Sequence, residues 1–170
     1  MAIEHDYFGV VDDDASGGLY WAETVDLGDQ PVEVELTARD AADVSEAGLD
    51  AAAAVINSLE GLDARARDAL IADLSQRDSV TTQYIDQRVD DRGESLLDLL
   101  VHNSGDIAMD VLRSLQLVRV ALRPDRTDDD EAFALFEYSI DPDESDALLE
   151  VGFDDRGDVV SVDDGEGAAP

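Results

Sequence analysis

The chain has 170 residues, of which 44% are hydrophobic, so it can bury the core of one domain and is not disordered as a whole. Its formal net charge of −32 comes from 43 acidic residues against 11 arginines, with no lysine and no cysteine. So negative a field repels nucleic acid and anionic lipid, and the lack of cysteine excludes disulfides, thiolate zinc sites and thiol catalysis.

The N-terminal stretch predicts neither a signal peptide nor a membrane anchor. It has no basic region followed by an apolar one, and the longest apolar runs in the chain fall far short of the roughly 18 residues that a membrane span needs. Together with the absence of cysteine, this pattern is typical of a cytosolic protein. We expect the first residues, with His5 among them, to be frayed.

Two strands are predicted after a short apolar run at residues 7–11. Residues 19–27 and 31–38 alternate apolar and polar side chains, and Gly28 to Gln30 form the turn between them. In the second strand Val32, Val34 and Leu36 share one face, which is the mark of a sheet with one face in water.

The central part of the chain changes to helical spacing. Helices are predicted over residues 45–59, 63–76, 79–89 and 94–115, the last interrupted at residues 102–106. Ser45 or Asp43 is expected to cap the first helix and Asp106 the last segment. Gly61 is expected to end the first helix, and Gly93 to break the chain after the third.

The last third returns to a period of two. Residues 116–124 place Val118, Val120 and Leu122 on one face, and residues 132–140 are apolar on both faces, which favours a central strand. Residues 147–155 and 159–162 form a predicted hairpin around Gly157. The acidic segment 163–170 is expected to be a frayed tail, so the predicted domain is residues 1–162.

Strands at both ends and helices between them predict an α+β fold. We expect the N-terminal and C-terminal strands to share one antiparallel sheet, with the helices packed on one face. No segment rich in proline, glycine or serine divides the chain.

The segments LQLVRVALRPDR and AFALFEYSIDPDESDALLEVGFDDRGDVVSV resemble the closing part of the domain of unknown function 2004 family. The similarity rests on the order and spacing of strands and turns over residues 7–162 and includes YFG, the aromatic pair Tyr20–Trp21 and a Gly turn. The chain departs from the family at Glu137, where an Asp precedes Tyr-Ser in the family, and at Asp163. Since the function of that family is not established, the resemblance implies a fold class and no reaction.

DPDESD, at residues 141–146, is the first candidate for a metal site. Asp141, Asp143 and Asp146 supply carboxylates, but the segment lacks the glycine turn and the spacing of a calcium loop. The competing interpretation is a loop between two strands, in which Ser145 or Asp146 makes a local turn. We favour the loop and keep the three aspartates as weak metal candidates.

Other constellations point to no reaction. The acidic triplets at residues 12–14 and 128–130 are typical of solvated loops, and His5 and His102 are too few for an imidazole metal site. Ser104 beside His102 lacks a nucleophile motif, and no loop that would hold a phosphate is present. No catalytic residue, cofactor or cofactor-binding residue is predicted. Carboxylate pairs are so numerous that none stands out.

The aromatic residues of the predicted strands are expected to pack in the core, namely Tyr20, Trp21, Phe133, Phe136, Tyr138 and Phe153.

Two functional hypotheses remain. The first is a small cytosolic binding protein that meets a basic protein partner, of the general type of the immunity proteins of bacterial toxin systems. The second is an enzyme that uses carboxylates or a divalent cation. Because no catalytic constellation is found, we favour the binding protein. A salt-rich cytoplasm or GC-rich coding would also produce the acidic composition.

Overall fold

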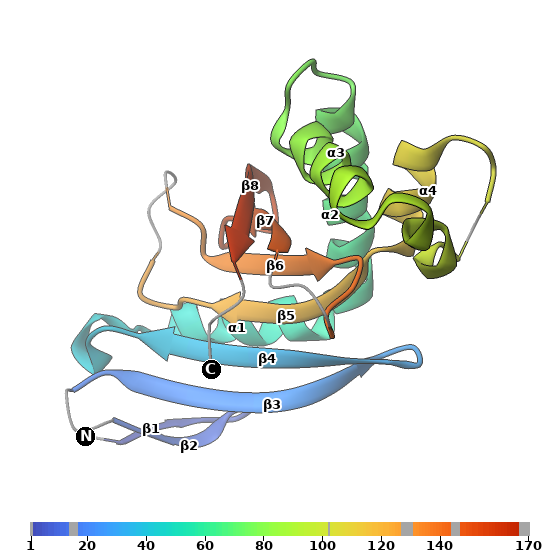
Figure 1. The fold of residues 1–170 in the computed structure, drawn as a ribbon. Helices are drawn as coiled ribbons and strands as arrows, with labels where there is room; N and C mark the ends of the chain where they lie inside the picture. Colours follow the sequence, from blue (N-terminus) through green and yellow to red (C-terminus); the bar gives the residue numbers. More distant parts are fainter. Residues whose placement is uncertain (1, 14–16, 102, 127–130, 144–146, 167–170) are drawn as a thin grey trace.

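The computed structural model describes residues 2–13, 17–101, 103–126, 131–143 and 147–166 (Figure 1). A small hairpin precedes a six-stranded sheet whose spatial order follows the chain. The hairpin strands are β1 (Ala2–His5) and β2 (Gly9–Asp12), and the sheet strands are β3 (Leu19–Leu27), β4 (Gln30–Ala38), β5 (Gln116–Leu122), β6 (Ala134–Ser139), β7 (Ala147–Phe153) and β8 (Val159–Glu166). The predicted α+β class is confirmed, and β6 is an interior strand as expected.

The sheet is mixed, whereas a wholly antiparallel sheet was predicted. The other neighbours in the six-stranded sheet are antiparallel, but β4 and β5 are parallel, with Val34 opposite Val120. The reason is that the whole helical part of the chain lies between these two strands and carries the chain back to the edge where β4 began. Such a crossover is what parallel pairing requires.

The helical part contains four α-helices and two short 3-10 helices in the described residues. They are η1 (Ala41–Asp43), α1 (Glu46–Asn57), α2 (Leu59–Leu74), α3 (Val80–Arg92), η2 (Gly93–Leu99) and α4 (Ile107–Ser114). The predicted caps are present, since Ser45 Oγ accepts a hydrogen bond from the N–H of Gly48 at 3.0 Å and Asp106 Oδ1 accepts one from Met109 at 3.2 Å. Gly93, with φ of 56°, ends α3.

The prediction that Gly61 ends the first helix is wrong. Helix α1 stops at Asn57, because Ser58 leaves the helical conformation with φ −110° and ψ 19°. Gly61 then falls in the first turn of α2, which continues to Leu74. A single residue between two helices is thus sufficient to turn the chain, and no glycine is needed there.

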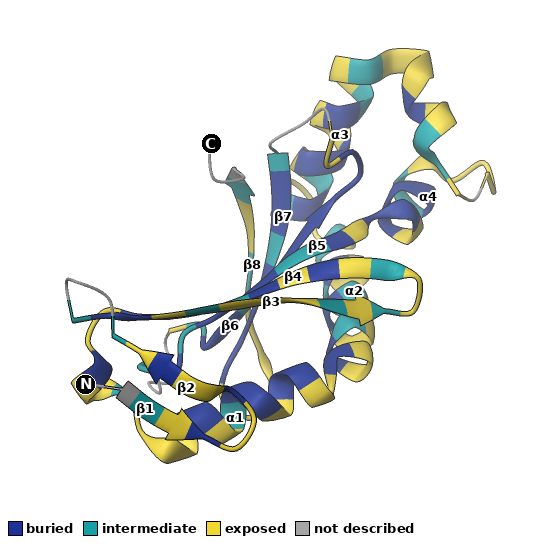
Figure 2. Cartoon of the chain, turned by 90° about the horizontal axis from the view of Figure 1, so that it is seen from below, coloured by how far each residue is buried: buried dark blue, intermediate teal, exposed yellow. Residues whose placement is uncertain are grey.

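Helix α1 runs behind β4 and β5 in the view of Figure 1, and the chain seen from below shows buried residues concentrated between the sheet and the helices (Figure 2). The alternation predicted for β4 is confirmed, since Val32, Val34 and Leu36 are fully buried. In β5 the prediction fails for one residue. The register shifts between Leu117 and Arg119, and as a result the Leu117 side chain points into the core while Val118 is only partly buried.

The strand aromatics divide between core and surface. Four of them are fully buried, as expected, namely Phe133, Phe136, Tyr138 and Phe153. Trp21 is partly buried and meets Phe8 of the hairpin with the ring centroids 4.8 Å apart. Tyr20 was also expected in the core, but its side chain points to the other face of β3 and is 55% exposed.

The N-terminal hairpin is an ordered part of the fold, in contrast to the expected frayed start. His5 ends β1, is buried, and its Nε2 lies 2.8 Å from Asp50 Oδ1 of α1. The hairpin therefore closes over the core beside α1.

Strand β8 also exceeds its prediction. It continues through residues expected in a frayed tail, since Asp163, Asp164 and Gly165 pair with β7. Those residues belong to the sheet because each lies opposite a residue of β7, from Glu150 back to Leu148. Within the described residues, none of the helices combines the length and the apolar character that crossing a membrane requires.

Candidate functional site

The face of the sheet opposite α1, here called the outer face, carries a line of charged residues. Cross-strand register places Arg119 opposite Glu137, Glu137 opposite Glu150, and Glu150 opposite Asp163. Glu35 of β4 joins this line because its carboxylate pairs with Arg119, whose register partner in β4 is Glu33. We call Glu35, Arg119, Glu137, Glu150 and Asp163 the outer-face charge row.

Arg119 is the cation of this row and holds two carboxylates. Its Nη2 is paired with Glu35, and its Nη1 donates to both oxygens of Glu137 at 3.3 and 3.4 Å. The Nε of Arg119 is buried and has no hydrogen-bond partner in the described residues. One guanidinium therefore neutralises part of a row that contains four carboxylates.

The two glutamates of β6 and β7 are unusual carboxyl groups. Glu137 is buried, with 7% of its surface exposed, and burial raises the pKa of its carboxyl group although Arg119 acts in the opposite direction. Burial also raises the pKa of Glu150, and the charges of Glu137 and Asp163 raise it further, against Arg123. Glu137 and Glu150 are thus opposite each other across the two strands, and burial raises both pKa values although Arg119 is paired with Glu137 and Arg123 also acts on both carboxyl groups.

A glycine makes room for Glu150. A Cβ placed on Gly165 of β8 would lie 2.3 Å from the Oε1 of Glu150 and 2.7 Å from its Cδ. The Glu150 carboxyl group therefore lies across the backbone of β8. Its orientation follows from the absence of a side chain at position 165.

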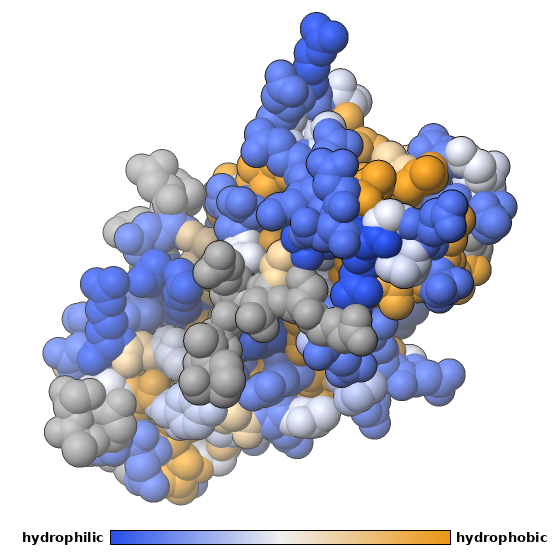
Figure 3. Space-filling model, in the orientation of Figure 1, coloured by the Kyte–Doolittle hydropathy of each residue, from blue (hydrophilic) through white to orange (hydrophobic). Residues whose placement is uncertain are grey.

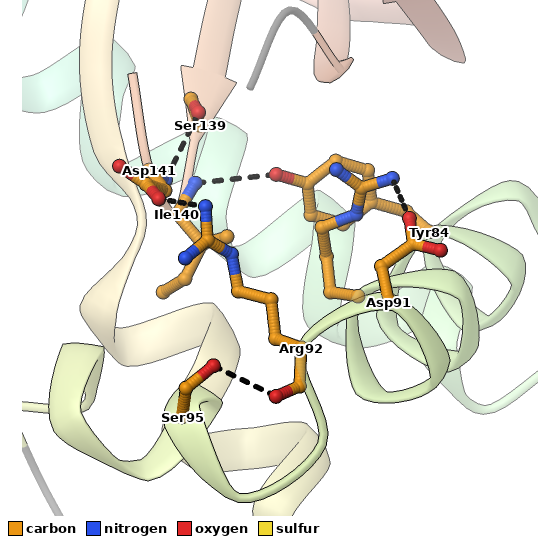
Figure 4. A network of polar contacts seen from close by, with 8 residues as sticks. Tyr84, Asp91, Arg92, Ser95, Ser139, Ile140 and Asp141 are labelled. Atoms are coloured by element: carbon orange, nitrogen blue, oxygen red, sulfur yellow. Dashed lines mark hydrogen bonds and ion pairs between the residues drawn. The ribbon is translucent and has the colours of Figure 1, made fainter. Parts of the chain in front are cut away.

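The first aspartate of DPDESD has a structural partner. Asp141 is buried and forms an ion pair with Arg92 at the end of α3 (Figure 4). Around it the N–H of Asp141 donates to Ser139 Oγ at 3.1 Å, and the N–H of Ile140 donates to Tyr84 Oη at 3.2 Å. Asp141 thus ties the end of β6 to α3, which fits the loop interpretation better than a metal site.

The remaining metal candidates do not gather around Asp141. Asp143 is exposed, and Asp146 lies outside the described residues. Of the acidic triplets, Asp12 belongs to β2 and Asp13 forms an isolated bridge with Leu19, while residues 14 and 128–130 are not described. Within the described ranges, no group of three or more His, Cys, Asp or Glu side chains is arranged to hold a metal ion.

Residues 103–106 of the HNSGD segment precede α4 and cap its start. Ser104 donates its hydroxyl to Asp110 Oδ1 at 2.7 Å and its N–H to Asp110 Oδ2 at 2.7 Å. These bonds from Ser104 lower the pKa of Asp110, because they favour the ionised carboxyl group. Ser104 therefore fixes the start of α4. His102, its predicted neighbour, lies outside the described residues.

Sequence reasoning missed the outer-face charge row. The available signal was a single acid in an otherwise apolar strand, Glu137 in AFALFEYSI, and a second, Glu150, in ALLEVGF. Acids that interrupt buried strands are costly and need a reason. Only the register of β6 and β7 shows that the two acids are opposite each other.

Comparison with known proteins adds no relative. No protein-family model matches the chain, and neither the curated proteins nor the solved structures gave a significant match. The resemblance to the domain of unknown function 2004 family stays a prediction.

Proposed function

We propose that this chain is a cytosolic binding module that meets a basic protein partner through the outer face of its sheet. The observation that supports this proposal is the use of the arginines. The chain has 43 acidic residues and 11 arginines, and at least six arginines are taken up in ion pairs with the chain's own carboxylates. These pairs are Arg67 with Asp63, Arg88 with Asp91, Arg92 with Asp141, Arg119 with Glu35 and Glu137, Arg126 with Glu131, and Arg156 with Asp154.

Because the acidic residues far outnumber the arginines, and at least six arginines are paired with the chain's own carboxylates, the surface attracts positively charged groups. Hydrophilic residues cover most of the molecule in the view of Figure 3, with apolar residues gathered in patches. Opposite charges on two partners accelerate their encounter and fix their relative orientation. The outer-face charge row offers such a partner a defined contact at Glu150 and Asp163, because Arg119 is already paired with Glu35 and Glu137 and the like charges of Glu137 and Asp163 raise the pKa of Glu150.

The test is a tagged capture from the native lysate at low and at high salt, followed by calorimetric titration of the recovered partner. We expect a stoichiometric basic protein that is lost at high salt. Glu150→Gln is expected to weaken its binding about tenfold, as loss of one charge-assisted contact does. The control is Asp86→Asn, an exposed carboxylate of α3 away from the sheet. Salt-independent capture, or equal affinity for both variants, would contradict the proposal.

A second candidate function is supported by the Glu137–Glu150 pair itself. Two carboxyl groups with raised pKa values at opposite positions of neighbouring strands are an arrangement that acid–base chemistry and divalent cations use. The check is thermal melting with calcium, magnesium or manganese against potassium chloride at matched ionic strength. A rise at micromolar ion that disappears in Glu150→Gln would support this carboxylate-dependent enzyme. A rise that follows ionic strength alone would leave charge screening as its cause.

A further inference from the structure

Three of the chain's 11 arginines line one pocket. The pocket has a volume of about 280 Å³ and is formed by Thr37, Ala38, Arg39, Arg123, Asp125 and Arg126. Three cations around one small space form an unexpected local excess of positive charge in a protein whose formal net charge is −32. Acidic composition, whatever its origin, does not explain it.

The pocket lies where β4 and β5 end. Strand β4 ends at Ala38 and β5 at Leu122, and these two strands form the one parallel pair among the described strands. The carboxyl ends of parallel strands open at the same edge of a sheet, and ligands of α/β sheets bind beyond that edge. The first turn of α1 closes in beside it, since a Cβ on Gly48 would lie 2.6 Å from the carbonyl oxygen of Pro124.

The cations of the pocket are incompletely neutralised. Arg126 pairs with Glu131 at 3.8 Å, and Asp125 uses Oδ2 to accept the backbone N–H of Arg39 at 3.2 Å. Within the described part of the chain, the guanidinium groups of Arg39 and Arg123 form no hydrogen bond or ion pair. Burial lowers the pKa of Arg123 and the charge of Arg126 lowers it further, against the carboxylates of Glu150, Asp125 and Glu137.

We propose that this pocket binds a small ligand through a dianionic oxyanion group, either a phosphate monoester or a pair of carboxylates. Guanidinium groups donate two parallel hydrogen bonds to such oxyanions, and Arg39 and Arg123, which have no ion-pair partner among the described residues, match a ligand charge of minus two. The volume suits a small molecule. A nucleic acid strand is disfavoured, because the field of the whole protein repels a polyanion.

This site is independent of the proposed basic partner, because it uses cations of the chain and a ligand of opposite sign. The two sites are neighbours, since Arg123 interacts with both Arg126 and the glutamates of the outer-face charge row. A failure to bind any dianion would therefore contradict only the anion site and not the proposed basic partner. A failure to find a basic partner would likewise leave the anion site to be tested separately.

The experiment is calorimetric titration of the intact protein with inorganic phosphate, glycerol phosphate and succinate. Potassium chloride and acetate at matched ionic strength serve as monoanion controls. We expect saturable binding of at least one dianion, and the phosphate and succinate arms tell the two oxyanion sources apart. Arg39→Gln and Arg123→Gln are each expected to weaken that binding at least about tenfold.

The matched control is Arg77→Gln, an exposed arginine between α2 and α3 that does not line the pocket. It is expected to bind the dianion as the unchanged protein does. Because Arg39 is exposed, Arg39→Gln keeps the test valid even if Arg123→Gln does not fold. Absence of saturable binding by every dianion, equal binding of chloride or acetate, or unchanged affinity in Arg39→Gln would overturn the proposal.

Discussion

Glu137 and Glu150 lie directly opposite each other on β6 and β7, and the pKa values of both carboxyl groups are raised. Arg119 lies on one side of this pair, and Asp163 on the other, where it adds a further negative charge. Groups with perturbed pKa values are concentrated at functional sites, and the proposed binding function uses the same carboxyl groups whose like charges oppose folding.

The first prediction concerns that repulsion. Glu150→Gln removes one of two like charges at directly opposite positions of β6 and β7, so we expect the free energy of unfolding at neutral pH to rise by about 0.5 kcal/mol. Denaturant titration measures it, with Glu23→Gln on the exposed part of β3 as control. A clear loss of stability in Glu150→Gln alone would show that the Glu150 charge is stabilising.

The pH dependence follows from the same pair. A carboxyl group whose pKa is higher in the folded than in the unfolded chain binds more protons when folded, so stability falls as the pH rises through the interval between the two values. We therefore expect the unchanged protein to gain stability from about pH 7 to about pH 5, and Glu150→Gln to gain less. Equal gains in both proteins would assign the effect to the net charge as a whole.

Arg119 is predicted to be the most important cation for stability. Arg119→Met leaves Glu35 and Glu137 unpaired in a mostly buried position, and we expect a loss of about 2–3 kcal/mol. Arg113→Met, at an exposed position of α4, is expected to change stability by less than about 0.5 kcal/mol. Similar losses in the two variants would contradict a special role of Arg119.

The buried hydroxyl group of Tyr138 anchors β6 to α2. Its Oη donates to Asp63 Oδ1 at 2.7 Å, and Arg67 lies over the Tyr138 ring at 5.2 Å from the centroid. We expect Tyr138→Phe to cost about 1–2 kcal/mol in urea titration, because the carboxylate of Asp63 loses a donor. Tyr20→Phe, on the exposed side of β3, should be silent by comparison.

Two helix glycines are predicted to respond in opposite ways to the same change. Alanine normally stabilises a helix by about 0.5–1 kcal/mol relative to glycine, and Gly61→Ala is expected to do so because the added Cβ would meet no atom within 4 Å beyond its chain neighbours and its own helix backbone. Gly48→Ala places that Cβ 2.6 Å from the carbonyl oxygen of Pro124, so we expect a loss of about 1–3 kcal/mol. Thermal melting separates the two, and a stabilised Gly48→Ala would show that α1 and Pro124 can move apart.

Much of the fold was predictable because most strands have one buried face. The alternation in β4 and the helix caps at Ser45 and Asp106 could be predicted because each depends only on residues that are close together in the sequence. Val118 was misplaced because a bulge shifts the period by one residue, which alternation alone does not show. His5 was expected at a frayed end because its partner, Asp50, lies far away in the sequence.

The candidate site was less predictable for a physical reason. Each of Glu137 and Glu150 is an acid within an apolar strand, but among 43 acidic residues no sequence pattern shows that these two lie opposite each other. Their proximity depends on the register between β6 and β7, and the arginine pocket depends on β4 and β5 being parallel neighbours. Such sites are made by pairings between distant segments, and a sequence shows the segments without the pairings.

The parallel contact between β4 and β5 also bears on the order in which the molecule folds. Strands β5 to β8 follow one another and form by short-range closures, whereas joining β4 to β5 closes a loop of about 80 residues at an entropic cost of about 4 kcal/mol. We therefore expect the β5–β8 meander to form early and the β3–β4 hairpin to attach late. In native-state hydrogen exchange, the amides of β4 should open at lower free energy than those of β6.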